Sequence, residues 1–145
     1  MNKYLSLALL LFVCAFAQAG SEQGGQFKTL GPWQVHYIAF PSTFIQPNIA
    51  KAYGLERSNY KATVNISVLS NSAEKPAQKV RLTGEARNLL GNKQNLEFKE
   101  VVDGDSVYYL AQIDFSNEET YRFKVTISQG NTQQVLNFQQ KFYVD

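Results

Sequence analysis

The feature that most constrains the fold of this chain is a repeated alternation of apolar and polar residues with a period of two. Between positions 60 and 69 every second residue is apolar, and the same spacing recurs from Trp33 to Ala39 and from Tyr121 to Ile127. Successive side chains of a β-strand point to opposite faces of a sheet, so this period is typical of strands with one buried face. The sequence therefore predicts a chain built mainly from β-strands.

Turn-forming residues separate the alternating segments. Asp103-Gly104 is a strong β-hairpin signal, and Gly130-Asn131 marks a second turn. Several strands at intervals of roughly ten residues predict an all-β antiparallel sandwich of about seven strands, immunoglobulin-like or fibronectin type III-like. We expect this sandwich to form a single domain over residues 27–145. Tyr121 follows a polar corner, where it is either the tyrosine corner of such domains or an ordinary core tyrosine.

One segment, Phe40 to Arg57, departs from the strand pattern. Gln46-Pro47 resembles a helix start and Gly54 a helix end, so we expect one short helix from about Pro47 to Tyr53, between the first two strands. Connections are normally short and polar, whereas this one is long and apolar. It either plugs one end of the sandwich or forms a binding surface. The candidate binding residues are Phe40, Phe44, Gln46, Ile49, Tyr53 and Arg57.

Residues 1–19 have the pattern of a secretory signal peptide. Lys3 precedes the apolar run from Tyr4 to Phe16, and Ala17-Gln18-Ala19 offers small residues for cleavage after Ala19. Cleavage would leave a flexible leader, residues 20–26, and a periplasmic protein. An uncleaved membrane anchor is a second interpretation, but the run is shorter than the ~20 residues that span a bilayer. We therefore expect cleavage, and no membrane span in the mature protein. A lipoprotein signal using Cys14 is the alternative.

Charge and composition argue against several classes of function. The formal net charge is +2, includes Lys3, and is spread without any block of like charge, so we expect no binding to nucleic acid or anionic lipid. The chain has one histidine, His36, and one cysteine, so clustered histidine or cysteine ligands cannot form within a single chain. We therefore expect no metal site and no cofactor. Ser-His-Asp catalysis would have to use His36, and we do not expect it because the sequence has no Gly-x-Ser-x-Gly nucleophile elbow.

Several short motifs along the chain match a pattern known from other proteins. They are Val35-His36-Tyr37, Thr43-Phe44-Ile45-Gln46-Pro47, Ala50-Lys51-Ala52-Tyr53-Gly54, Ala86-Arg87-Asn88-Leu89-Leu90-Gly91 and the ending Phe138-Gln139-Gln140-Lys141-Phe142-Tyr143-Val144-Asp145. On these residues the chain resembles the domain-of-unknown-function 4426 family of small exported proteins of Gram-negative bacteria. The resemblance implies a periplasmic β-sandwich and brings no catalytic residue, cofactor or activity with it.

Three functions remain open at this point. The favoured one is a non-catalytic binding or accessory module of the cell envelope, which would contact an envelope protein or peptide through Phe40 to Arg57 or through a sheet edge. The second is a hydrolase that uses carboxylates only, whose defining separation cannot be read from a sequence. The third is a structural subunit that associates with copies of itself. We do not expect an enzyme.

The signal-peptide interpretation predicts that the exported form begins at Gly20 and is soluble. The intact mass of the protein recovered from a periplasmic fraction measures this directly, because cleavage removes residues 1–19. A mass that still includes Met1, or one that carries a lipid on Cys14, would contradict the interpretation.

Overall fold

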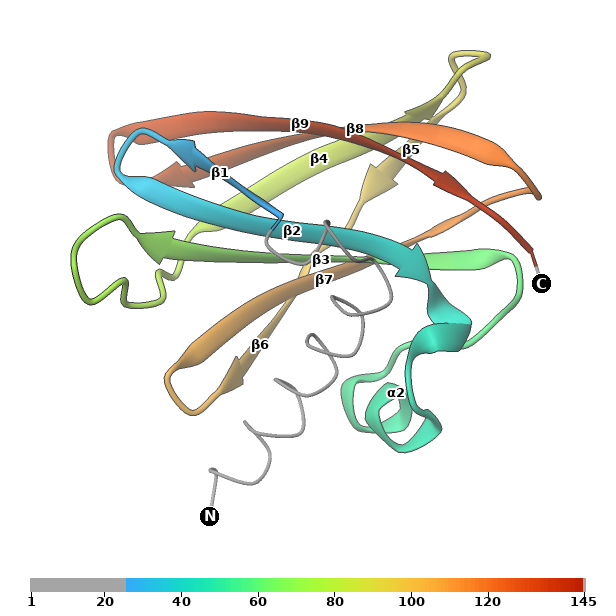
Figure 1. Ribbon diagram of the computed structural model, residues 1–145, viewed down its shortest axis with the longest axis horizontal. Coiled ribbons are helices and arrows are strands. Elements are labelled where there is room, and N and C mark those ends of the chain that lie inside the picture. Colours follow the sequence, from blue (N-terminus) through green and yellow to red (C-terminus); the bar gives the residue numbers. More distant parts are fainter. Residues whose placement is uncertain (1–25, 145) are drawn as a thin grey trace.

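Two antiparallel β-sheets packed face to face make up the structure, a computed structural model that describes residues 26–144 (Figure 1). Sheet A has the strand order β1-β2-β3-β7-β6, and sheet B has the order β5-β4-β8-β9. The predicted signal peptide and nearly all of the predicted leader lie outside the described residues. No helix within residues 26–144 has the length and apolar character needed to cross a membrane.

The described residues form nine strands and two short helices. Their bounds are β1 Phe27–Leu30, β2 Trp33–Pro41, the 3-10 helix η2 Ser42–Phe44, α2 Pro47–Tyr53, β3 Lys61–Ser70, β4 Arg81–Asn88, β5 Lys93–Leu96, β6 Lys99–Asp103, β7 Ser106–Asp114, β8 Glu119–Gln129 and β9 Thr132–Phe142.

The antiparallel sandwich is confirmed, but it has nine strands rather than the seven expected. Part of the difference lies before the Asp103-Gly104 hairpin turn, where residues 93–103 form two strands, because the chain crosses from sheet B to sheet A between Leu96 and Lys99. Leu96 pairs with Gly84 in sheet B, whereas Lys99 pairs with Leu110 in sheet A.

The strand β1 is the other difference, and it changes the place of the helix. Three of its four residues are exposed, so no alternation of burial marks it in the sequence. Because β1 pairs with β2 ahead of the predicted first strand, α2 follows the second strand rather than the first. The bounds expected for the helix, Pro47 to Tyr53, are those of α2.

The main core lies between the two sheets and uses the inward faces that the alternation predicts. Apolar side chains from both sheets meet there, and many of them are completely buried. The set includes Trp33 and Val35 of β2, Val64, Ile66 and Val68 of β3, Tyr109 and Ile113 of β7, Phe123, Val125 and Ile127 of β8, and Leu136 and Phe142 of β9.

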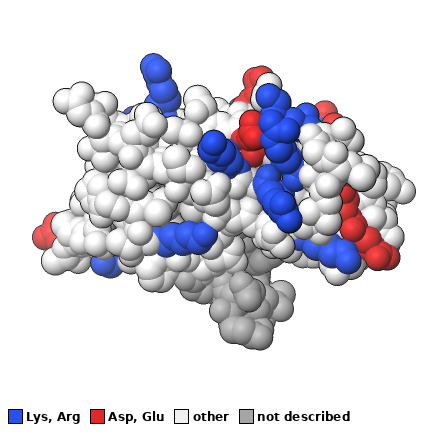
Figure 2. All heavy atoms as spheres, turned by 90° about the horizontal axis from the view of Figure 1, so that it is seen from above, with Lys and Arg blue, Asp and Glu red and all other residues white. Residues whose placement is uncertain are grey.

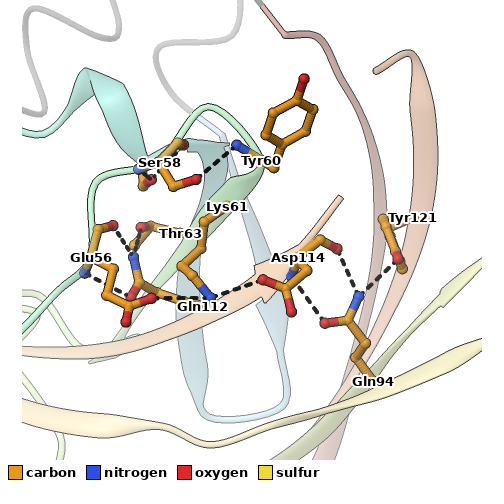
Figure 3. A network of polar contacts seen from close by, with 10 residues as sticks. Glu56, Ser58, Tyr60, Lys61, Thr63, Gln94, Gln112, Asp114 and Tyr121 are labelled. Carbon is orange, nitrogen blue, oxygen red and sulfur yellow. Dashed lines mark hydrogen bonds and ion pairs between the residues drawn. The ribbon is translucent and has the colours of Figure 1, made fainter. Parts of the chain in front are cut away.

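Polar side chains hold the sheets together at the corner before β8. The Gln94 amide donates hydrogen bonds to the Asp114 carbonyl (2.7 Å) and the Tyr121 hydroxyl (2.8 Å), and its oxygen accepts from the Asp114 amide (2.9 Å) (Figure 3). Tyr121 is buried, and its hydroxyl interacts with Gln94 of β5 and with Glu119 of the preceding corner, so it is a core tyrosine that also contacts that corner. Glu119 holds that corner by accepting hydrogen bonds from the Ser116 amide and the Asn88 side chain.

Deleting everything after Gln134 should prevent folding. The deletion removes the buried Leu136 and Phe142, and also Phe138, whose ring stacks on Phe123 at 4.7 Å. Burial of each large apolar side chain contributes about 1.5–3 kcal/mol, against a net stability of about 5–15 kcal/mol for a typical domain. Thermal unfolding followed by circular dichroism tests this, with Val135→Ser on the outward side of β9 as a control that should fold. A cooperative transition in the truncated chain would refute the role given to β9.

Candidate functional site

The bridging segment, residues 42–60, joins β2 to β3 and crosses the outer face of sheet A (Figure 1). Phe40, Ile45 and Ala50 are buried together there, with Ile38 and Ile49 packed against them. This small cluster is separate from the core between the sheets. The interpretation that the helix plugs one end of the sandwich is therefore wrong, because the segment adds a third, partial layer on one face.

Residues at the ends of α2 explain why this short helix forms where it does. Gln46 has an extended backbone before the helix, and Pro47 occupies the first helical turn, where its missing N–H costs nothing. Gly54 ends the helix with φ +68°, a conformation that side-chain-bearing residues adopt at a cost, and the Leu55 amide then closes the last turn on the Ala50 carbonyl (2.8 Å). Two turns are unstable alone, so contact with sheet A must stabilise them.

Side chains within the bridging segment fix its shape. The Arg57 guanidinium donates to the Ile45 carbonyl (2.7 Å) and to the Thr43 carbonyl (3.1 Å). Ser42 is completely buried; its hydroxyl donates to the Ser58 carbonyl (3.1 Å) and accepts from the Ser58 amide (2.8 Å). These contacts tie the turn after β2 to the turn before β3, so the loop has one preferred conformation.

Gln112 on β7 anchors the segment to sheet A (Figure 3). Its side-chain oxygen accepts from the Glu56 amide (3.1 Å), and its nitrogen donates to the Glu56 carbonyl (2.9 Å) and to the Thr63 hydroxyl (3.0 Å). The amide group thus satisfies both backbone groups of Glu56, as a neighbouring strand would. A loop lying on a sheet needs such partners, since an unpaired buried backbone group is costly.

An ionic contact beside this anchor joins the same elements. The Lys61 ammonium lies 3.3 Å from the Glu56 carboxylate and 2.9 Å from the Asp114 carboxylate (Figure 3). The hydrogen bond with Asp114, followed by the one with Glu56, raises the pKa of Lys61 despite its partial burial. Both carboxylates are exposed and share one cation, so this group ties the bridging segment to β3 and β7.

The candidate binding residues divide into supporting and surface positions. Phe40, which is 2 % exposed, and Ile49 lie in the apolar layer, and Arg57 acts as the clamp already described. Gln46 is exposed at the start of α2. Phe44 is 48 % exposed, and its ring stacks on that of Phe40 with centroids 6.5 Å apart. Phe44, Gln46 and Arg57 are therefore the members of this group that reach the surface.

Tyr53, the remaining candidate, lies away from Phe44 in a second apolar cluster. It packs with Leu55 against Val101, Tyr108 and Leu110 of strands β6 and β7. Burial raises the pKa of Tyr53, and the charge of Asp103 raises it further. Burial and the same carboxylate raise the pKa of Tyr108, against a hydrogen bond with Ser106 that lowers it. This cluster fixes the end of α2 on the sheet.

Sequence reasoning missed Tyr60 and the residues that hold it. Tyr60 is 58 % exposed and follows the Ser58 turn that Ser42 fixes; in Figure 3 its ring points away from the hydrogen-bond network. The sequence placed it at the edge of a strand, where an exposed aromatic carries no pattern of its own. Ser42 and Gln112 gave no signal because their partners are distant along the chain.

His36 has an ordinary environment on β2. Its Nε2 lies 2.9 Å from the Gln34 side-chain oxygen, and its ring contacts Phe27 at 5.1 Å between centroids. Burial lowers the pKa of His36, and the nearby positive charge of Lys75 lowers it further. Within residues 26–144, no group of three or more histidine, cysteine, aspartate or glutamate side chains is arranged to hold a metal ion.

The fold and the segment packed on its outer face define a two-sheet antiparallel sandwich with a helical connection after its second strand. The sequence model described as "Domain of unknown function (DUF4426)" matches residues 27–145. The chain therefore belongs to the DUF4426 family. A DUF4426 family protein from Pseudomonas aeruginosa PAO1 has the same fold, with 33 % sequence identity and a TM-score of 0.73 over 85 % of this chain and 98 % of that one. No curated protein is significantly similar in sequence.

More distant structural neighbours share the fold alone. FetP of uropathogenic Escherichia coli strain F11, recombinantly expressed in the periplasm, is 13 % identical, with a TM-score of 0.59 over 83 % of this chain and 94 % of that one. A copper-bound variant of FetP is 15 % identical, with a TM-score of 0.54 over 81 % of this chain and 88 % of that one.

Replacing Phe44 by Ala should cost much less stability than replacing Phe40 by Ala. Phe44 is half-exposed, and its removal loses the stacking on Phe40 among its contacts, at a cost of about 1 kcal/mol, whereas Phe40 is buried and its removal leaves a cavity, about 3–5 kcal/mol. Urea unfolding of both variants measures the difference. Equal and large losses would show that Phe44 is a packing residue and not a surface residue.

Proposed function

We propose that this protein is a non-catalytic binding module of the bacterial periplasm, and that the bridging segment contacts a protein or peptide partner. The pattern of residues 1–19 supports export to the periplasm, as does the likeness in fold to a FetP that was expressed there. The copper of the FetP variant is not extended to this chain, since that likeness concerns the fold alone.

The observation that carries the proposal is a rigid loop that exposes aromatic side chains. The backbone of the bridging segment forms hydrogen bonds with the side chains of Arg57, Ser42 and Gln112. Phe44 and Tyr60 are nevertheless about half exposed on turns that this network holds. Ordering a loop before binding lowers the entropy lost in the complex, and aromatic side chains are enriched at the centres of protein interfaces.

The composition around these aromatics indicates the chemistry of the partner. Gln46 at the start of α2 and the outer side of Arg57 offer polar groups beside Phe44. An apolar centre with a polar rim is the usual anatomy of a protein interface. We therefore propose a partner segment with an apolar or aromatic side chain for the centre and hydrogen-bonding groups for the rim.

A photo-crosslinking amino acid tests the surface position by position. Introduced at Phe44 or at Tyr60, it should capture one discrete envelope protein in living cells. The matched control is Asn131, which is exposed on the turn between β8 and β9. Excess unlabelled parent protein should suppress capture by competing for the partner. The Phe44→Ser/Tyr60→Ser protein lacks two interface anchors, so we expect that at least about tenfold more of it is needed for the same suppression.

Each other outcome is informative. Capture of the protein's own copies alone would favour a self-associating subunit. Equal capture at Asn131, or equal competition by the double variant, would refute the bridging segment as the contact surface.

A further inference from the structure

The outer face of sheet B is strongly basic, although the sequence contains no block of positive charge. Figure 2 looks onto this face and shows Lys and Arg side chains gathered over one part of it. Its outward positions bring together residues that are far apart in the chain, because β4 pairs with both β5 and β8. We call this set the basic face; its members are Arg87, Lys93, Arg122, Lys124 and Lys141.

Strand register places like charges directly beside one another on the basic face. Arg87 pairs with Lys93 on one side and with Arg122 on the other, so three cations form one row across β5, β4 and β8. Like charges at directly opposed positions destabilise a sheet. Among the described outward positions of these strands the one carboxylate is Glu85, which Arg87 engages at 2.8 Å. The row therefore keeps an excess of positive charge that an anionic partner would neutralise.

The turn that follows this row exposes two leucines. Leu89 is 64 % exposed and Leu90 is 87 % exposed, although such side chains are normally buried. The turn connects β4 to β5 and rises beyond the outer face of sheet B (Figure 1). Its tip thus carries an apolar pair next to the charged row.

Hydrogen bonds from Asn88 hold this turn in one conformation. The buried Asn88 accepts from the Leu90 amide (3.0 Å) and the Asn92 amide (2.9 Å) through its side-chain oxygen, while its nitrogen donates to Glu119 (2.9 Å). Arg87 adds a hydrogen bond to the Gly91 carbonyl (3.2 Å). The turn is closed internally, so the exposure of the two leucines is a fixed property of the fold.

The leucine turn and the basic face form one continuous surface. An open hollow of about 350 Å³ is lined by Leu89 and Gly91 of the turn and by Arg122 and Lys124 of β8. Its open shape does not enclose a small ligand. Apolar side chains at a protruding tip, with cations around their base, match the boundary of a bilayer, where acyl chains lie beneath charged headgroups.

The sequence, with no block of like charge, led us to expect no binding to anionic lipid, but strand register gathers the cations on one face. We therefore propose that the basic face and the leucine turn dock on the surface of a membrane that contains anionic phospholipid. Leu89 and Leu90 enter the headgroup region, and Arg87, Arg122 and Lys124 contact lipid phosphates. Two features favour a bilayer over an acidic protein. The apolar pair stands out beyond the sheet instead of lining a pocket, and the hollow is open over a broad area. This surface lies on the opposite sheet from the bridging segment, so both can act together.

Sedimentation with large vesicles tests the proposal on protein purified from the periplasmic fraction. Vesicles of phosphatidylethanolamine with phosphatidylglycerol should bind the protein, and vesicles of phosphatidylcholine alone should bind it at least about tenfold more weakly, as the loss of two or more charge contacts predicts. Binding should weaken as the salt concentration is raised from about 0.05 M to about 0.5 M, because salt screens the attraction between the cations and the lipid phosphates.

Two variants separate the apolar and ionic parts. Leu89→Ser/Leu90→Ser should lower vesicle affinity about tenfold or more, since two apolar side chains no longer enter the interface. Arg122→Gln/Lys124→Gln should lower it about fivefold per charge removed. The charge-matched control is Lys51→Gln/Lys75→Gln, on α2 and on the loop after β3, and the apolar control is Val102→Ser on β6. Both controls should bind as the parent protein does.

Tryptophan fluorescence measures whether the leucine turn inserts into the bilayer. Trp33 is buried in the core, so a Leu90→Trp variant reports the turn by fluorescence, and its emission should shift to shorter wavelength with anionic vesicles. No binding to anionic vesicles, an equal loss in the controls, or binding without the fluorescence shift would each overturn the proposal. Retention on a polyglutamate resin without vesicle binding would assign the basic face to an acidic protein instead.

Discussion

Packing between the inward faces of the two sheets is the interaction on which the rest of this structure depends. The chain has a single cysteine, Cys14, so no disulfide can close within one molecule. The inward residues of both sheets must therefore provide the stability, and many of them are fully buried. Since these positions take every second residue of each long strand, the outward residues are not constrained by the packing between the sheets. The two outer faces differ accordingly, with an apolar layer on sheet A and a group of cations on sheet B (Figure 2).

The inward positions could be predicted from the sequence because they depend only on local spacing. The alternation at Val64, Ile66 and Val68 holds whatever strand lies beside β3, and Pro47 and Gly54 mark the helix by their own backbone preferences. The crossing between Leu96 and Lys99 could not be predicted in this way. It changes the sheet to which the chain belongs without interrupting the run of strand-forming residues.

The surfaces were harder to predict because they depend on register between distant strands. Arg87 and Arg122 are unremarkable in the sequence and become neighbours only through the pairing of β4 with β8. Net charge gives no hint of this row, although Glu85 is the one carboxylate among the described outward positions of β4, β5 and β8. The bridging segment was partly predictable: its apolar content marked it as unusual, but the division into packed Phe40 and half-exposed Phe44 required the fold.

The same physical device supports both proposed surfaces. Each is a loop whose backbone polar groups are satisfied by side chains of the protein, Asn88 in the leucine turn and Gln112 with Arg57 in the bridging segment. A loop that relied on water for these bonds would have to reorganise as a partner displaced that water. Internal satisfaction removes this cost, and it leaves the exposed apolar side chains of each loop as the groups that gain from contact.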